Sequence, residues 1–165
     1  MGDQGEFVPS GPAKHEPSTP ENIAEMERLI EEGLQQGALA VGFGLAYTPA
    51  TNTEEFEAML GVAKKHGAPS HIHLRSKGVE ALKEATSSAI KVGTPLHVVH
   101  INSTGAEQTG EMLSLIEEAR EKGHDITTEA YPYEAGMTGI EAAFFDDANG
   151  AVVVWMGHSD QALVT

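Results

Sequence analysis

Apolar residues along the chain follow two alternating spacings, which predict helices and buried strands in turn. After Thr19, apolar residues recur at helical spacing as far as Gly37, as in an amphipathic helix. The continuous apolar run at 38–47 is typical of a strand that is buried on both faces. The pattern then repeats, with helices expected over 53–67, 78–92 and 107–122 and strands over 69–74, 95–101 and 125–130. Strands that alternate with helices of this length form βαβ units around a parallel sheet.

The expected fold is an α/β fold with about four to five parallel strands. A complete (β/α)8 TIM-type barrel needs about 250 residues, and this chain has 165. We therefore expect either a partial barrel or a small open α/β sheet over residues 20–165, after an irregular, Pro- and Gly-rich lead-in at 1–19. In the tail, a short helix is expected near 139–145 and an apolar run spans 151–156.

Composition excludes several classes of function. Ten basic and 25 acidic residues give a formal net charge of −15, which disfavours nucleic acid and anionic membranes as partners. The chain has no cysteine, so it has no disulfides, thiolate nucleophiles or thiolate metal ligands. It has no apolar run long enough for a membrane span and no apolar signal segment near Met1, so we expect a cytoplasmic protein.

Histidines gather where the predicted strands end. Functional residues of parallel α/β folds lie at the carboxyl ends of the strands, and His73 and His100 are near the ends of neighbouring strands. His71 and His73 share one face of their strand, because side chains alternate between faces. By the same rule His97 and His100 point to opposite faces, and His97 is expected between sheet and helix. Two imidazoles from adjacent strands suit zinc, although they do not complete a catalytic site.

Four motifs, in order along residues 20–145, resemble those of one enzyme family. The first is a helix followed by Gly37-Ala38 and by a strand that ends in Gly44-Leu45-x-Tyr47-x-Pro49. The second is His73-x-Arg75, the third is the strand that ends at His100, and the fourth is Tyr131-Pro-Tyr-x-Ala-Gly. Together they resemble the N-acyl-D-amino-acid deacylases (D-aminoacylase-like) of the metal-dependent amidohydrolase superfamily.

This resemblance implies a TIM-type barrel and a zinc-dependent hydrolase that cleaves the linear amide bond of N-acyl-D-amino acids. It implies that His73 and His100 are metal ligands. Tyr131, with Arg75, would orient the carboxylate of a small-molecule substrate.

The chain also departs from the family, which leaves alternatives open. The family's HxH pair on the first strand and its proton-transfer aspartate on the last strand have no clear counterpart, and Met137 replaces a serine. His71 could join the ligands if His71-x-His73 were itself the HxH pair, and Asp160 is a candidate for the aspartate. We therefore expect an interior segment of such a hydrolase that is inactive alone and could self-associate through exposed sheet edges. The alternative is a small non-catalytic α/β module that binds a metal or another ligand.

Overall fold

A computed structural model describes residues 14–133, 136–139, 153–156 and 161–164 of the chain. As far as β4 (Ile126–Thr128), helical segments and strands alternate along the chain as the sequence predicts. In order they are α1 (Pro20–Gln35), β1 (Val41–Gly44), α2 (Thr53–Lys65), β2 (Ser70–His73), α3 (Val79–Val92), β3 (Leu96–Val98), α4 (Ile101–Gly105), η2 (Ala106–Gln108), α5 (Thr109–Glu121), β4 (Ile126–Thr128), β5 (Gly136–Gly139), β6 (Val153–Met156) and β7 (Gln161–Val164).

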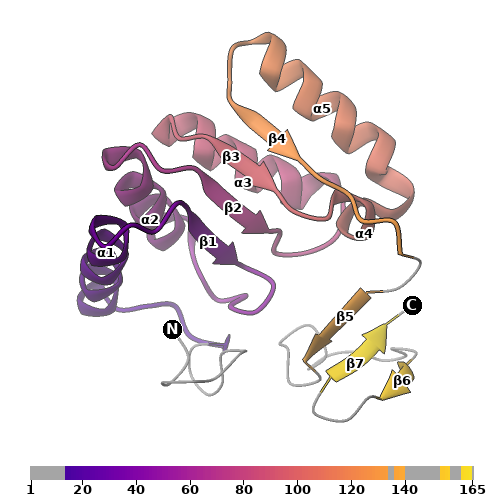
Figure 1. The fold of residues 1–165 in the computed structure, drawn as a ribbon, viewed down its shortest axis with the longest axis horizontal. Coiled ribbons are helices and arrows are strands. Elements are labelled where there is room, and N and C mark those ends of the chain that lie inside the picture. Colours follow the sequence, from indigo (N-terminus) through magenta and orange to yellow (C-terminus); the bar gives the residue numbers. More distant parts are fainter. Residues whose placement is uncertain (1–13, 134–135, 140–152, 157–160, 165) are drawn as a thin grey trace.

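The first four strands form one parallel sheet in the order β1-β2-β3-β4. Helices α2, α3 and α5 lie on one side of this sheet, and α1 packs beside α2 (Figure 1). The predicted α/β fold is thereby confirmed, and its parallel sheet has four strands among the described residues, where four to five were expected. Within the described residues, β1 and β4 each pair with a single strand, so both edges of the sheet are open.

The hydrophobic core lies between the sheet and these helices. Alternate strand residues point into it, including Ile72, Leu96 and Val98, which are almost fully buried. Phe56 and Leu60 of α2 cover them, and they too are almost inaccessible to solvent. Since alternate strand residues point to opposite faces, burial of this face turns the remaining side chains toward the uncovered face.

Local signals set the ends of several helices. Thr19 accepts a hydrogen bond from the backbone N–H of Asn22, and Pro20 occupies the first helical position of α1. Asn52 caps α2 in the same way through the N–H of Glu55. Gly93 ends α3 in the left-handed conformation, with φ of 79°.

The structure also contains a second sheet, which the sequence did not predict. Strands β5, β7 and β6 form a three-stranded antiparallel sheet, which lies beyond the carboxyl ends of the parallel strands (Figure 1). The expected apolar run at 151–156 contributes β6, while most of the expected helix at 139–145 and residues 1–13 of the lead-in lie outside the described residues. The hydroxyls of Tyr47 and Thr138 lie 3.3 Å apart and link the loop after β1 to β5.

The predicted strand over 95–101 is too long. Strand β3 ends at Val98, and α4 begins at Ile101. The intervening turn satisfies its backbone through Glu129, whose carbonyl accepts the N–H of Ile101 and whose carboxylate accepts the N–H of His100. The apolar pattern thus continues past the end of the strand, because Ile101 is buried although it is the first residue of a helix.

Among the described helices, none combines the length and the apolar character needed to cross a bilayer.

Replacing Leu60 with alanine should lower the free energy of unfolding by ~2–5 kcal/mol, because Leu60 is fully buried and its loss leaves a cavity. Leu113→Ala is the matched control, since Leu113 is also helical but is 45% exposed. It should change stability by roughly 0.5 kcal/mol or less. Urea unfolding followed by circular dichroism measures both, and equal losses would contradict this placement of the core.

Candidate metal centre

The candidate site lies at the carboxyl ends of β2 and β3. His73 is the last residue of β2, and His100 lies in the turn between β3 and α4. His100 has φ of 41° and ψ of 52°, a left-handed conformation that is uncommon for a residue with a side chain. The N–H of His100 donates to the Glu129 carboxylate at 2.9 Å, and the hydroxyls of Ser103 and Thr104 lie near its carbonyl. These contacts hold a strained backbone, as is common at functional sites.

The turn brings the two imidazoles together. The Nδ1 atom of His73 lies 3.2 Å from the Nε2 atom of His100, and one of these nitrogens donates a hydrogen bond to the other. The ring centroids are 4.4 Å apart, with an angle of 75° between the planes. The predicted pair His73 and His100 is thus assembled with a ring nitrogen of each directed at the other.

This spacing fits two ligands of one zinc ion. Zinc binds histidine nitrogen at about 2.0–2.1 Å in tetrahedral geometry, so two ligand nitrogens lie about 3.3 Å apart. The observed 3.2 Å between His73 and His100 agrees with that separation. Within the part of the chain that the structure describes, no group of three or more histidine, aspartate or glutamate side chains is placed to hold an ion. His73 and His100 could therefore be two of the protein ligands of a zinc site, which ordinarily has about three.

Burial keeps both imidazoles in the form that binds metal. Burial, and to a smaller extent the neighbouring His100, lowers the pKa of His73 from 6.5 to about 4. Burial also lowers the pKa of His100, although the Glu129 carboxylate opposes the shift. Both rings are accordingly neutral near pH 7, as ligands must be.

Tyr47 packs against His73 and was not singled out as a site residue from the sequence. The two rings are edge to face, with centroids 5.0 Å apart. A Cβ atom at Gly44 would lie 2.8 Å from the Tyr47 ring, so glycine is needed for the ring to lie over the end of β1. The motif Gly44-Leu45-x-Tyr47 was the available signal, but it carried only the family resemblance.

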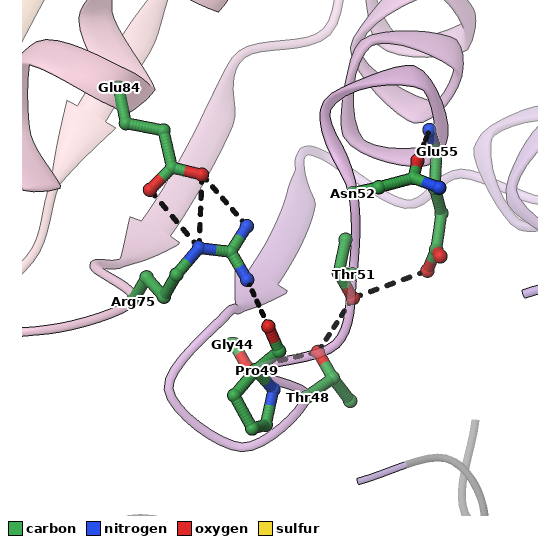
Figure 2. Close-up of polar contacts among 8 residues, drawn as sticks. All are labelled: Gly44, Thr48, Pro49, Thr51, Asn52, Glu55, Arg75 and Glu84. Atoms are coloured by element: carbon green, nitrogen blue, oxygen red, sulfur yellow. Dashed lines mark hydrogen bonds and ion pairs between the residues drawn. The ribbon is translucent and has the colours of Figure 1, made fainter. Parts of the chain in front are cut away.

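The Arg75 guanidinium is bound to two neighbouring groups. Its guanidinium forms a bidentate ion pair with Glu84 of α3, with nitrogen–oxygen distances of 2.8–3.1 Å (Figure 2). Its Nη1 atom donates at 2.7 Å to the carbonyl of Pro49 in the loop after β1. In the same loop, Thr51 bonds to Thr48 and to Glu55 (Figure 2). Arg75 thus ties the loop that carries Tyr47 to α3.

Tyr131 is positioned by Asn102, a residue for which the sequence suggested no role. The Asn102 side-chain amide donates to the Tyr131 carbonyl at 3.1 Å, and its oxygen accepts the Tyr131 N–H at 3.3 Å. The Tyr131 ring stacks on Tyr133, with centroids 6.2 Å apart. This double contact fixes the start of the Tyr-Pro-Tyr segment relative to α4, which follows His100.

The expectation that His97 lies between sheet and helix is wrong. His97 is in register with His71, and their rings lie 4.8 Å apart, so both are on the uncovered face of the sheet. The alternation rule fails at His100 because the strand ends at Val98 and the turn redirects the next side chain. His71 shares the uncovered face with His73, but it contacts His97 rather than the His73–His100 pair. Asp160, the candidate proton carrier, lies outside the described residues.

Comparisons with known proteins support the class that the fold and the histidine pair indicate. The chain is 32% identical over 146 residues to the D-aminoacylase of Alcaligenes xylosoxydans xylosoxydans, a match that covers 84% of this chain and 30% of that protein. A crystal structure of D-aminoacylase, described as defining a novel subset of amidohydrolases, is 29% identical with a TM-score of 0.68, over 79% of this chain and 29% of that one. The zinc-bound N-acyl-D-glutamate deacylase of Bordetella bronchiseptica, in complex with a phosphonate that mimics the tetrahedral intermediate, shares the fold, with a TM-score of 0.69 at 22% identity over 81% of this chain and 29% of that one.

The resemblance to metal-dependent amidohydrolases is therefore confirmed. Within that superfamily, the chain is related to the N-acyl-D-amino-acid deacylases of the D-aminoacylase type over most of its length. It spans about 30% of the length of the curated relatives that it matches. No protein-family model matches the chain.

The metal-free chain should lose stability as the pH falls from about 6.5 to about 4. The pKa of His73 is lower in the folded chain than in the unfolded chain, so the unfolded chain binds more protons in this window and acid favours it. Urea unfolding across this pH range, with a chelator present, measures the effect. His73→Gln should make the free energy of unfolding less dependent on pH in this window. An unchanged pH dependence in that variant would contradict the lowered pKa of His73.

Proposed function

We propose that this chain is a segment of a zinc-dependent hydrolase that cleaves the amide bond of N-acyl-D-amino acids. The observation that carries the proposal is the 3.2 Å approach of His73 Nδ1 to His100 Nε2 at the ends of adjacent strands. The proposal is also supported by the sequence relationship, because the chain that carries this pair is 32% identical to a D-aminoacylase. In the reaction, water adds to the acyl carbon, the C–N bond breaks, and a carboxylate and a D-amino acid leave.

The residues of this chain have separate roles in the proposal. His73 and His100 would hold a zinc ion, and the chemistry that this ion would supply is a lowered pKa of bound water and polarisation of the amide carbonyl. Tyr131 contacts the substrate carboxylate, with its backbone held by Asn102. Arg75 contributes through the loop that it fixes at the Pro49 carbonyl, and so through the position of Tyr47 against His73.

The chain alone is expected to bind zinc without turnover. A catalytic zinc has about three protein ligands and an open position, whereas the described residues bring two histidines together. The reaction also needs a group that takes the proton from water and returns it to the leaving amine. No carboxylate among the described residues is placed with the histidine pair to do so, apart from Glu129, which holds the His100 backbone.

The zinc proposal predicts that His100→Ala weakens Zn²⁺ binding at least 10-fold, because one of two ligands is lost. His73→Ala should do the same, whereas His124→Ala, which removes a histidine beyond the end of α5, should have no effect. Titration calorimetry and metal analysis after dialysis measure the change. Equal zinc binding by His100→Ala and the native chain would overturn the assignment of the pair.

Turnover separates the hydrolase segment from a complete enzyme. Purified chain with Zn²⁺ should release no detectable D-methionine from N-acetyl-D-methionine. Turnover that is abolished by His100→Ala would show that the chain is a hydrolase by itself and would refute the expectation that it is inactive alone. Zinc binding without turnover, by itself, also fits the alternative of a non-catalytic binding module. Replacing the corresponding segment of a D-aminoacylase with this chain separates these two, because only a hydrolase segment restores activity in the chimera.

We further propose that two copies of the chain associate through their open sheet edges. The edge at β1 carries an apolar groove of about 510 Å³ between α1, β1 and α2, and nearby Leu39 is 88% exposed. Four strands are half of the eight in a closed barrel, so the β4 edge of one copy can pair with the β1 edge of the other. Light scattering should show a dimer that Leu39→Lys weakens, and a monomer at all concentrations would contradict this pairing.

A further inference from the structure

A second pair of histidines lies on the uncovered face of the sheet, on the same two strands as the first. His71 of β2 and His97 of β3 are partners in the strand register. Their ring centroids are 4.8 Å apart, and the ring planes are inclined by 42°. In a single copy of the chain, His71 is exposed and His97 is partly exposed, so both rings are accessible to solute there. This arrangement places two imidazoles side by side on rigid backbone.

A third strand orients one of these rings. The Nδ1 atom of His97 lies 2.8 Å from the Oγ1 atom of Thr127, its register partner on β4. When Nδ1 donates to this hydroxyl, Nε2 is the deprotonated nitrogen and can accept a metal. Metal-binding histidines commonly have their second nitrogen fixed in this way, which sets the tautomer and the direction of the ring.

There is open space beside His71 on the same face. Its register partner on β1 is Gly42, and a Cβ atom placed there would meet no atom within 4 Å. A metal ion with two imidazole ligands needs water molecules to complete its coordination. The missing side chain at Gly42 leaves room for them.

We propose that His71 and His97 form a second binding site for a divalent transition-metal ion, separate from the His73–His100 pair. Imidazole nitrogen binds Cu²⁺, Ni²⁺ and Zn²⁺, with Cu²⁺ strongest at a given site. His71 and His73 are two residues apart on one strand, which corresponds to about 6.6 Å along β2. The ring nitrogens of His73 and His100 face one another, whereas the ring of His71 lies beside that of His97, so the four histidines form two separate pairs. The inference rests on the geometry of this second pair and does not depend on the hydrolase assignment.

The test is Cu²⁺ titration of the full chain in a buffer that does not bind metal. Calorimetry gives the stoichiometry and affinity, and electron paramagnetic resonance shows nitrogen ligation of the ion. We expect His71→Ala to remove one bound Cu²⁺, or to weaken that site at least 10-fold, and His97→Ala to have the same effect. His124→Ala is the matched control and should leave both sites unchanged.

Two further variants distinguish this site from the proposed zinc centre. His100→Ala should abolish binding at the His73–His100 pair and leave the His71–His97 site intact. Thr127→Val, which keeps the side-chain shape and removes the hydroxyl contact with His97, should weaken only the second site. Circular dichroism shows whether each variant is folded, and His71 and His97 serve as independent tests if one of them is not. Unchanged Cu²⁺ stoichiometry and affinity in a folded His71→Ala or His97→Ala variant would overturn the proposal.

Discussion

Burial of one face of the parallel sheet is the constraint on which the arrangement of the histidines depends. Ile72, Leu96 and Val98 are buried under α2, α3 and α5, and reversing them would expose a large apolar surface. The two-residue alternation of a strand then sends His71 and His97 to the opposite face. The buried apolar residues of the strands therefore determine the direction of the histidine rings, and no charged partner is needed to turn the rings outward.

The part of the structure that follows from periodicity could be predicted from sequence. Helical spacing between Thr19 and Gly37 located α1, and the apolar run around β1 located the first strand. The convergence of His73 and His100 was also predictable, because parallel strands end at one edge of the sheet. These features depend on local pattern and on a general rule of topology, so neither required knowledge of tertiary contacts.

The remaining features depend on contacts between residues far apart in the chain. The orientation of His97 was misjudged because Val98 ends the strand, and Glu129, about thirty positions on, stabilises the turn that follows. The pairing of Arg75 with Glu84 likewise depends on how α3 packs after β2. No periodicity marks such pairs, and glutamate at these positions resembles many other solvated charges of an acidic chain.

The contact between Gly44 and Tyr47 has a consequence for how this sequence can vary. Any larger residue at Gly44 would displace the tyrosine ring, and the ring is what covers the edge of His73. A side chain at position 44 would exclude the tyrosine ring from its present place. A small residue at position 47 would leave space for a side chain at position 44, so glycine would no longer be needed there. The two positions, three residues apart, are therefore expected to change together among homologous chains, because their side chains share one packing contact.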